Sequence, residues 1–177
     1  IFPYLDALRL RKTREILESE LKTAQAKKPS YSSFLLNLMR QEFEDKRNRA
    51  VQNRVKQSGV PELWSLDTYP FHIQKGVDKK LHYELAELDF IDRAENIVWI
   101  GATGVGKTGL AGAILLKALH AGRTGRMIKA QDLFDELSPS AADRSTRALI
   151  KRLARLDVLV VDELGYIDPL PGQVNQF

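Results

Sequence analysis

Eight consecutive residues past the middle of the chain limit its possible folds more strongly than any other part of the sequence. These are Gly101, Ala102, Thr103, Gly104, Val105, Gly106, Lys107 and Thr108. They match the phosphate-loop pattern, which is a glycine, four residues, then glycine, lysine and serine or threonine. Glycines let the backbone wrap closely around phosphates, which then face its N–H groups and the positive end of the next helix. We therefore expect a nucleotide site, with Lys107 at the β and γ phosphates and the Thr108 hydroxyl on Mg²⁺.

A second motif is the acidic pair Asp162 and Glu163, which follows the mostly apolar segment 156–161. By itself such a pair could equally be a strand cap, but it and the phosphate loop predict each other. We expect Asp162 to hold the metal through its water shell and Glu163 to orient and deprotonate the attacking water. This arrangement indicates hydrolysis rather than transfer to a small-molecule hydroxyl. The sequence has no guanine-reading Asn-Lys-x-Asp motif, which favours ATP over GTP.

The apolar pattern divides the chain into three parts. Residues 1–60 carry two amphipathic helical patterns and predict a small N-terminal helical domain. Residues 61–77 combine prolines and a glycine with aromatic side chains, which predicts a linker that packs onto a domain. Residues 78–177 form the nucleotide-binding domain.

In that third part, strand and helix patterns alternate. We expect strands at 96–100, 126–130 and 157–161, and helices at 78–88, 108–121, 131–137 and 143–154. This order predicts an α/β fold with a parallel sheet and flanking helices.

Three segments of the chain together resemble the IstB family. They read GATGVGKTGLA around the phosphate loop, LDVLVVDELGY around the acidic pair, and SSFLLNLMRQEFEDKRNRAVQNR leading to PELWSLDTYPF. Proteins of this family are AAA+ ATPases that assist the transposase of an insertion sequence, and they are related to the helicase loader DnaC. The resemblance covers essentially the whole chain, and its most specific part is the run from Asp162 to Tyr166.

The resemblance implies a P-loop ATPase of the AAA+ class that uses ATP and Mg²⁺. It implies double-stranded DNA and a transposase as partners, and a homo-oligomer that forms with ATP and uses the N-terminal helical domain. ATP binding would drive assembly on DNA and hydrolysis would reset it. The segment from Leu66 to Phe71 corresponds to the linker near which the adenine sits in the family. The chemistry leaves two alternatives open: a replicative helicase loader, and a nucleotide-binding assembly module without turnover.

Basic residues are concentrated in the N-terminal third, where residues 1–60 hold 13 Lys and Arg against 7 Asp and Glu. Arg40, Arg47 and Arg54 recur every seven residues, and such a helical stripe can meet DNA phosphates. Glu42 with Lys46 and Asp45 with Arg49 stand four residues apart, so part of the charge is used in pairs worth ~0.3 kcal/mol each. An oligomer contact or a solvated face explains the stripe equally well.

An AAA+ sheet has a further strand between the phosphate-loop strand and the acidic-pair strand, and this chain does not supply it. We therefore expect the domain to be incomplete at its C-terminus, with residues 173–177 beginning a helix that leads to that strand. The sensor residue and the arginine finger would then lie beyond Phe177.

Composition excludes several other classes of protein. The chain has no cysteine and three scattered histidines, which excludes disulfides and thiolate metal sites. No apolar run approaches the ~18 residues of a membrane span. We expect a cytoplasmic protein that does not enter a membrane.

Overall fold

The structure, a computed structural model, describes residues 1–74, 76–143 and 146–166, and the side chains of these residues except in 138–146 and at 166. Contacts divide the chain into two compact units, Ile1–Asn53 and Arg54–Phe177. Residues 61–77, expected as a linker, pack within the second unit. The predicted domain limits 1–60, 61–77 and 78–177 stay a prediction.

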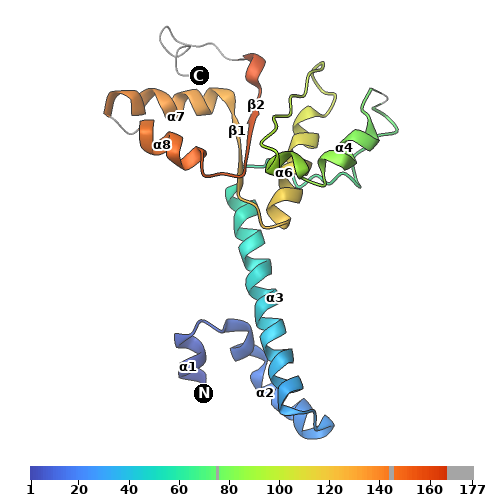
Figure 1. Cartoon of the computed structure of the whole chain (residues 1–177), viewed down its shortest axis with the longest axis vertical. Helices are drawn as coiled ribbons and strands as arrows, with labels where there is room; N and C mark the ends of the chain where they lie inside the picture. Colours follow the sequence, from blue (N-terminus) through green and yellow to red (C-terminus); the bar gives the residue numbers. More distant parts are fainter. Residues whose placement is uncertain (75, 144–145, 167–177) are drawn as a thin grey trace. The chain divides into compact units, whose positions relative to one another are not determined.

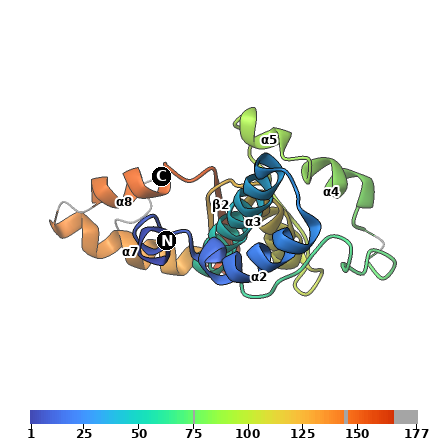
Figure 2. The same ribbon diagram turned by 90° about the horizontal axis from the view of Figure 1, so that it is seen from below.

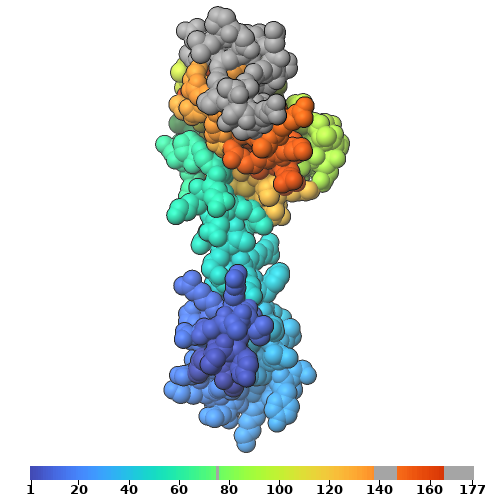
Figure 3. Space-filling model, turned by 90° about the vertical axis from the view of Figure 1, so that its left-hand side faces the viewer, coloured from blue at the N-terminus to red at the C-terminus, as the bar shows by residue number. Residues whose placement is uncertain are grey.

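The first unit is helical. It contains α1 (Phe2–Ala7), α2 (Arg11–Lys27) and most of α3 (Tyr31–Gln57), and their side chains pack closely in the space-filling view (Figure 3). Leu17 of α2 and Leu38 of α3 are buried. The two long helices are also joined by the Asn37 amide, which donates to the Glu20 carboxylate at 2.8 Å.

Both charge pairs predicted on α3 are present, and one of them has a further function. Arg49 lies 2.7 Å from Asp45, and Lys46 lies 3.8 Å from Glu42. The Glu42 side chain is only 4% exposed and accepts a hydrogen bond from the Thr13 N–H at 2.7 Å. Because free N–H groups occur in the first turn of a helix, Glu42 caps α2 as well as pairing along α3.

The second unit is built on a small parallel sheet. Strand β1 (Gly125–Lys129) pairs with β2 (Val158–Asp162), and α7 (Ala130–Asp143) and α8 (Thr146–Leu153) connect them. Figure 1 shows the two strands side by side, with α7 and α8 on one side and α6 (Lys107–His120) on the other. These elements agree with the predicted strands at 126–130 and 157–161 and with the predicted helices around them.

Alternation along β1 explains the layered core. Met127 packs with Leu115 and Leu119 of α6, whereas the next residue, Ile128, packs with Leu133 and Leu149 of α7 and α8. Successive side chains of a strand point to opposite faces, so one short strand serves both layers. Figure 2 shows α7 and α8 beside each other in a second view.

The segment 61–77 and the helices after it cover the other side of α6. Leu66 and Tyr69 are buried against Leu110 and Ala113 of α6. The chain continues through α4 (Lys79–Leu85) and α5 (Asp89–Asp92). After β2 comes a short 3-10 helix, η1 (Leu164–Tyr166).

The strand predicted at residues 96–100 is wrong, because this segment has no regular secondary structure. Val98 is 75% exposed and Ile100 is 93% exposed. An apolar segment becomes a strand only when its backbone pairs with a neighbour, and the sheet of the described residues consists of β1 and β2 alone. Side chains hold the segment instead: Trp99 packs near Ile114 and donates to His82 Nε2 at 3.2 Å.

Two expectations from the sequence concern the C-terminal end of the chain and membrane-spanning helices. The helix predicted to begin at residues 173–177, and the strand after it, lie outside the described residues. In the part of the chain that is described, no helix is both long enough and apolar enough to cross a membrane.

Candidate nucleotide site

The phosphate loop leads directly into the most buried helix of the second unit. Helix α6 begins at Lys107 and follows Gly106, whose φ is +87°. Leu115, Ala118 and Leu119 on this helix are fully buried. A helix with apolar residues on all sides is held by its neighbours. The loop is therefore attached to the most firmly packed element near it.

Lys107 closes the loop on itself in this structure. Its ammonium group donates to the carbonyl oxygens of Gly101 and Ala102, both at 2.9 Å. The predicted partners of this group are the β and γ phosphates, so a bound nucleotide would replace contacts to neutral carbonyl oxygens by contacts to anionic phosphate oxygens, which attract the ammonium group more strongly.

The two motifs found in the sequence meet at Thr108. Its hydroxyl donates to Asp162 Oδ2 at 2.8 Å, across 54 residues of sequence. Asp162 is the last residue of β2, and Thr108 lies in the first turn of α6. The packing of α6 against β2 thus brings the phosphate loop and the acidic pair together.

Glu163 takes an unusual backbone conformation. Its φ is +58°, in the left-handed region, and its N–H donates to Asp162 Oδ1 at 2.9 Å. Residues other than glycine adopt this conformation at a cost of about 1–2 kcal/mol, and such residues cluster at functional sites. The turn redirects the chain immediately after β2.

Lys129 holds the Glu163 side chain. Its Nζ lies 3.0 Å from Glu163 Oε2, and the hydrogen bond to this carboxylate raises the pKa of Lys129. In the strand register Lys129 is the partner of Asp162, so β1 places a positive charge beside the acidic pair. The sequence reasoning did not single out Lys129, although its position at the end of the neighbouring strand was the available signal.

A pocket of about 380 Å³ opens beside the phosphate loop. Gly104, Gly106 and Thr108 line one part of it, and Trp64 and Tyr69 line another. The Tyr69 hydroxyl donates to the carbonyl oxygen of Val105 at 2.9 Å, and burial raises the pKa of this tyrosine. The family resemblance implies that the adenine lies near residues 66–71, but the bond from Tyr69 to the loop backbone is seen only in the tertiary structure.

The oxygen atoms at the junction suit a magnesium ion. Mg²⁺ prefers oxygen ligands and is held in nucleotide sites by one or two protein groups together with substrate phosphates. The hydroxyl of Thr108 and the carboxylate of Asp162 lie 2.8 Å apart and supply such groups. Among the described side chains no cluster of three or more His, Cys, Asp or Glu could hold a metal by itself.

The three arginines of the predicted stripe share one helix. All three lie on α3, where Arg40 and Arg47 are exposed and Arg54 is half-buried. Arg40 and Arg47 belong to the first compact unit and Arg54 to the second. No salt bridge joins any of the three to an acidic side chain that the structure describes.

The sequence is similar to ATP-binding proteins of bacterial insertion sequences. It is 34% identical over 151 residues to the ATP-binding protein of insertion sequence IS21 from Pseudomonas aeruginosa. The aligned residues are 85% of this chain and 57% of the relative. It is 35% identical over 146 residues to the ATP-binding protein of IS5376 from Geobacillus stearothermophilus, and the aligned residues are 82% of this chain and 58% of that relative. An IS21-like relative from Bacteroides fragilis (strain YCH46) is 32% identical over 159 residues, which are 90% of this chain and 79% of that relative.

The chain thus spans somewhat more than half the length of the first two of these relatives. The family match is more extensive along the chain itself, because residues 4–173 match the IstB-like ATP-binding proteins. This range includes the phosphate loop and the acidic pair. The chain therefore belongs to the IstB-like family of ATP-binding proteins.

Proposed function

We propose that this chain binds ATP with Mg²⁺ and hydrolyses it, and that the whole protein uses this cycle in DNA transposition. The observation that carries the proposal is the hydrogen bond between Thr108 and Asp162, which joins the two motifs that P-loop hydrolysis requires. Family membership supports ATP as the nucleotide.

The geometry suggests how the nucleotide lies. The loop residues receive the phosphates, and the base enters the pocket lined by Trp64, Tyr69 and Pro70. These flat apolar side chains suit a purine ring. Lys107 leaves the carbonyl oxygens of Gly101 and Ala102 and pairs with the phosphates.

Glu163 is the candidate base for the attacking water. Its backbone follows Asp162 directly, and its carboxylate is held at the end of the sheet by Lys129. Mg²⁺, when bound, neutralises charge that develops on the phosphates. The carboxylate has to release Lys129 before its oxygen can contact the attacking water, because the ammonium group of Lys129 occupies it in this structure.

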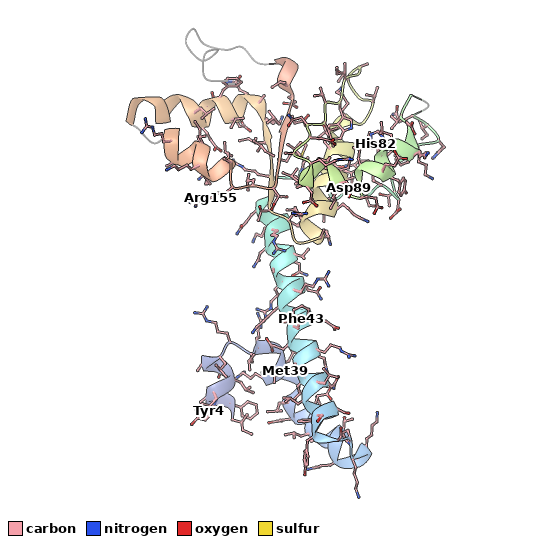
Figure 4. All side chains as sticks on the ribbon, viewed as in Figure 1. Tyr4, Met39, Phe43, His82, Asp89 and Arg155 are labelled. Carbon is pink, nitrogen blue, oxygen red and sulfur yellow. The ribbon has the colours of Figure 1, made fainter. Side chains whose placement is uncertain are left out.

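The proposed partners follow from the relatives and from the first unit. The relatives are named as ATP-binding proteins of insertion sequences, which points to DNA and a transposase. The exposed Arg40 and Arg47 have the charge for duplex DNA. Tyr4 of α1 and Met39 and Phe43 of α3 are exposed apolar side chains in the same unit (Figure 4), which supports assembly into a homo-oligomer.

Two substitutions test the enzymatic part. Lys107→Ala removes the phosphate ligand and is expected to weaken ATP binding about tenfold or more. Glu163→Gln keeps the shape but removes the base, so phosphate release is expected to fall by about 100-fold or more while ATP binding is retained. Binding is measured by isothermal titration with MgATP, and turnover by release of inorganic phosphate.

Lys117→Ala is the matched control, because Lys117 is an exposed lysine of α6 that lies away from the loop. Equal phosphate release from the wild type and Glu163→Gln would contradict the assignment of the base. Normal ATP affinity in Lys107→Ala would contradict the site itself.

One observation favours a second candidate, a nucleotide-binding assembly module without turnover. The Lys129 ion pair occupies the carboxylate that hydrolysis requires. Under this alternative, MgATP binds but the wild type releases no phosphate, with or without duplex DNA. A helicase loader remains the alternative for the partner, and it is tested by pull-down with a transposase and with a hexameric helicase.

A further inference from the structure

We propose that the hydroxyl of Tyr69 is a positioning group for phosphate binding, because it fixes the orientation of the peptide between Val105 and Gly106 in the phosphate loop. The inference rests on the proposed nucleotide site and goes beyond it by assigning a function to a side chain outside the loop. Its basis is the hydrogen bond from this hydroxyl to the Val105 carbonyl oxygen, at 2.9 Å across 36 residues of sequence.

The first step of the argument concerns the peptide plane. A trans peptide unit is planar, so its C=O and its N–H point in opposite directions. The Val105 carbonyl oxygen points toward Tyr69, and the N–H of Gly106 therefore points away from Tyr69. A phosphate loop binds its anion through such N–H groups.

The second step concerns the freedom of Gly106. Its φ of +87° suits glycine, and a Cβ at this position would lie only 2.5 Å from the Tyr69 hydroxyl oxygen. Glycine is therefore required both by the backbone and by the close approach of the ring. Glycine also populates negative φ about as readily as positive φ, so this peptide can rotate by half a turn at little cost.

The third step concerns the effect of such a rotation. The rotated peptide would direct the Val105 carbonyl oxygen toward the phosphates and remove one N–H donor. A carbonyl oxygen carries partial negative charge, so it repels the anion that the loop is meant to bind. The bond from Tyr69 selects the binding orientation before the nucleotide arrives.

Tyr69 is well suited to this task. The side chain is 7% exposed, packs edge-to-face on Phe71 at 4.7 Å between ring centroids, and belongs to the cluster that covers α6. A tyrosine hydroxyl is protonated at neutral pH, and burial raises the pKa of this one further, so it is a donor there. Ring position and proton are thus both fixed.

The test compares Tyr69→Phe with Tyr83→Phe in the full-length protein. Tyr69→Phe keeps the ring and removes the hydroxyl. Tyr83→Phe removes a hydroxyl whose partner is Asp67 at 2.9 Å, outside the loop and the pocket. The probes are MgATP and inorganic tripolyphosphate, and the second probe has no base.

We expect Tyr69→Phe to bind both probes about threefold to tenfold more weakly, which is the ratio that one ordinary hydrogen bond supports. Tyr83→Phe is expected to keep wild-type affinity. Weaker binding of MgATP with unchanged binding of tripolyphosphate would overturn the proposal, because the hydroxyl would then act on the base. Unchanged binding of both probes in a folded Tyr69→Phe protein would also overturn it.

A second measurement uses the wild type and does not depend on how the variant folds. In glycine-labelled wild-type protein, the Gly106 amide proton is expected to shift downfield when tripolyphosphate binds, because the phosphate then accepts a hydrogen bond from this N–H. A wild-type Gly106 amide that does not move downfield overturns the proposal even if the variant is unfolded. If the wild type binds neither probe, the proposed function fails and this inference fails with it.

Discussion

At the scale of single residues, each reactive group of the site has a protein partner in this structure. Lys107 contacts two loop carbonyls, Thr108 contacts Asp162, and Glu163 contacts Lys129. In each contact, a protein atom occupies a group that we propose binds a nucleotide, a metal ion or a water molecule. These groups of the site are therefore already hydrogen-bonded, and ligand binding exchanges one set of polar contacts for another.

The Lys129 contact leads to a prediction about the base. In Lys129→Met the Glu163 carboxylate loses its ion pair and gains freedom, so we expect basal phosphate release to rise about twofold to fivefold. Lys129→Arg keeps the charge and is expected to resemble the wild type. The measurement is steady-state phosphate release at saturating MgATP, with Lys117→Met as the matched lysine control. A fall in turnover in Lys129→Met would show that the lysine places the carboxylate for its reaction.

At the scale of elements, the sheet is fastened where its two strands begin. The Asp157 carboxylate accepts hydrogen bonds from the N–H and the hydroxyl of Thr124, both at 2.7 Å. The backbone hydrogen bond from Thr124, followed by its side-chain bond, lowers the pKa of Asp157. These contacts fix the register of the two strands at one end of the sheet. In this register Lys129 and Asp162 are paired at the other end.

Asp157 gives a prediction for stability against pH. Because its pKa is lower in the folded protein, the charged form stabilises the fold above the unfolded value near 3.8, and this contribution is lost as pH falls through the folded pKa. Asp157→Asn is expected to lower the free energy of unfolding by about 1 kcal/mol or less near neutral pH, since the group is partly exposed. The difference from the wild type should shrink on acidification below about pH 4.

Urea unfolding at several pH values measures this effect. Asp89→Asn is a suitable control, because Asp89 is exposed on α5 (Figure 4). A difference between Asp157→Asn and the wild type that stays constant with pH would argue against the carboxylate as its source.

At the scale of the whole molecule, charge is the property that points to a polyanion. The excess of basic residues lies in the first 60 residues, and Arg40 and Arg47 have no salt-bridge partner among the described acidic side chains. Arg49 on the same helix is paired with Asp45. The two exposed arginines are therefore the better candidates for phosphate contacts, and Arg54, which is half-buried, is the weaker one.

Salt dependence separates specific phosphate contacts from overall charge. If Arg40 and Arg47 each contact one phosphate, the double variant Arg40→Ala with Arg47→Ala should bind duplex DNA more weakly. The slope of log affinity against log salt should fall in magnitude by about 2. Lys22→Ala with Lys27→Ala makes the same charge change on α2 and is the control. Fluorescence anisotropy over a salt series gives both slopes, and identical slopes for the two double variants would reject the contact.

Local patterns in the sequence were enough to predict the candidate site and to recognise the family. Residues 101–108 and the pair Asp162 and Glu163 are local patterns, since neighbouring residues carry the whole signal, and their resemblance to the IstB family is confirmed. The helices and the strands at 126–130 and 157–161 were predictable for the same reason, because each depends on the periodicity of its own segment.

Contacts between residues that are far apart along the chain became known from the fold, not from the sequence patterns. Residues 96–100 have the composition of a strand, but the described residues offer them no pairing neighbour, and Trp99 is held through His82 instead. Tyr69 contacts Val105 across 36 residues of sequence and Lys129 contacts Glu163 across 34 residues, so no local sequence pattern predicts either contact. The physical reason is that hydrogen bonds and ion pairs form between groups close in space, whereas a sequence pattern reports only which groups are close along the chain.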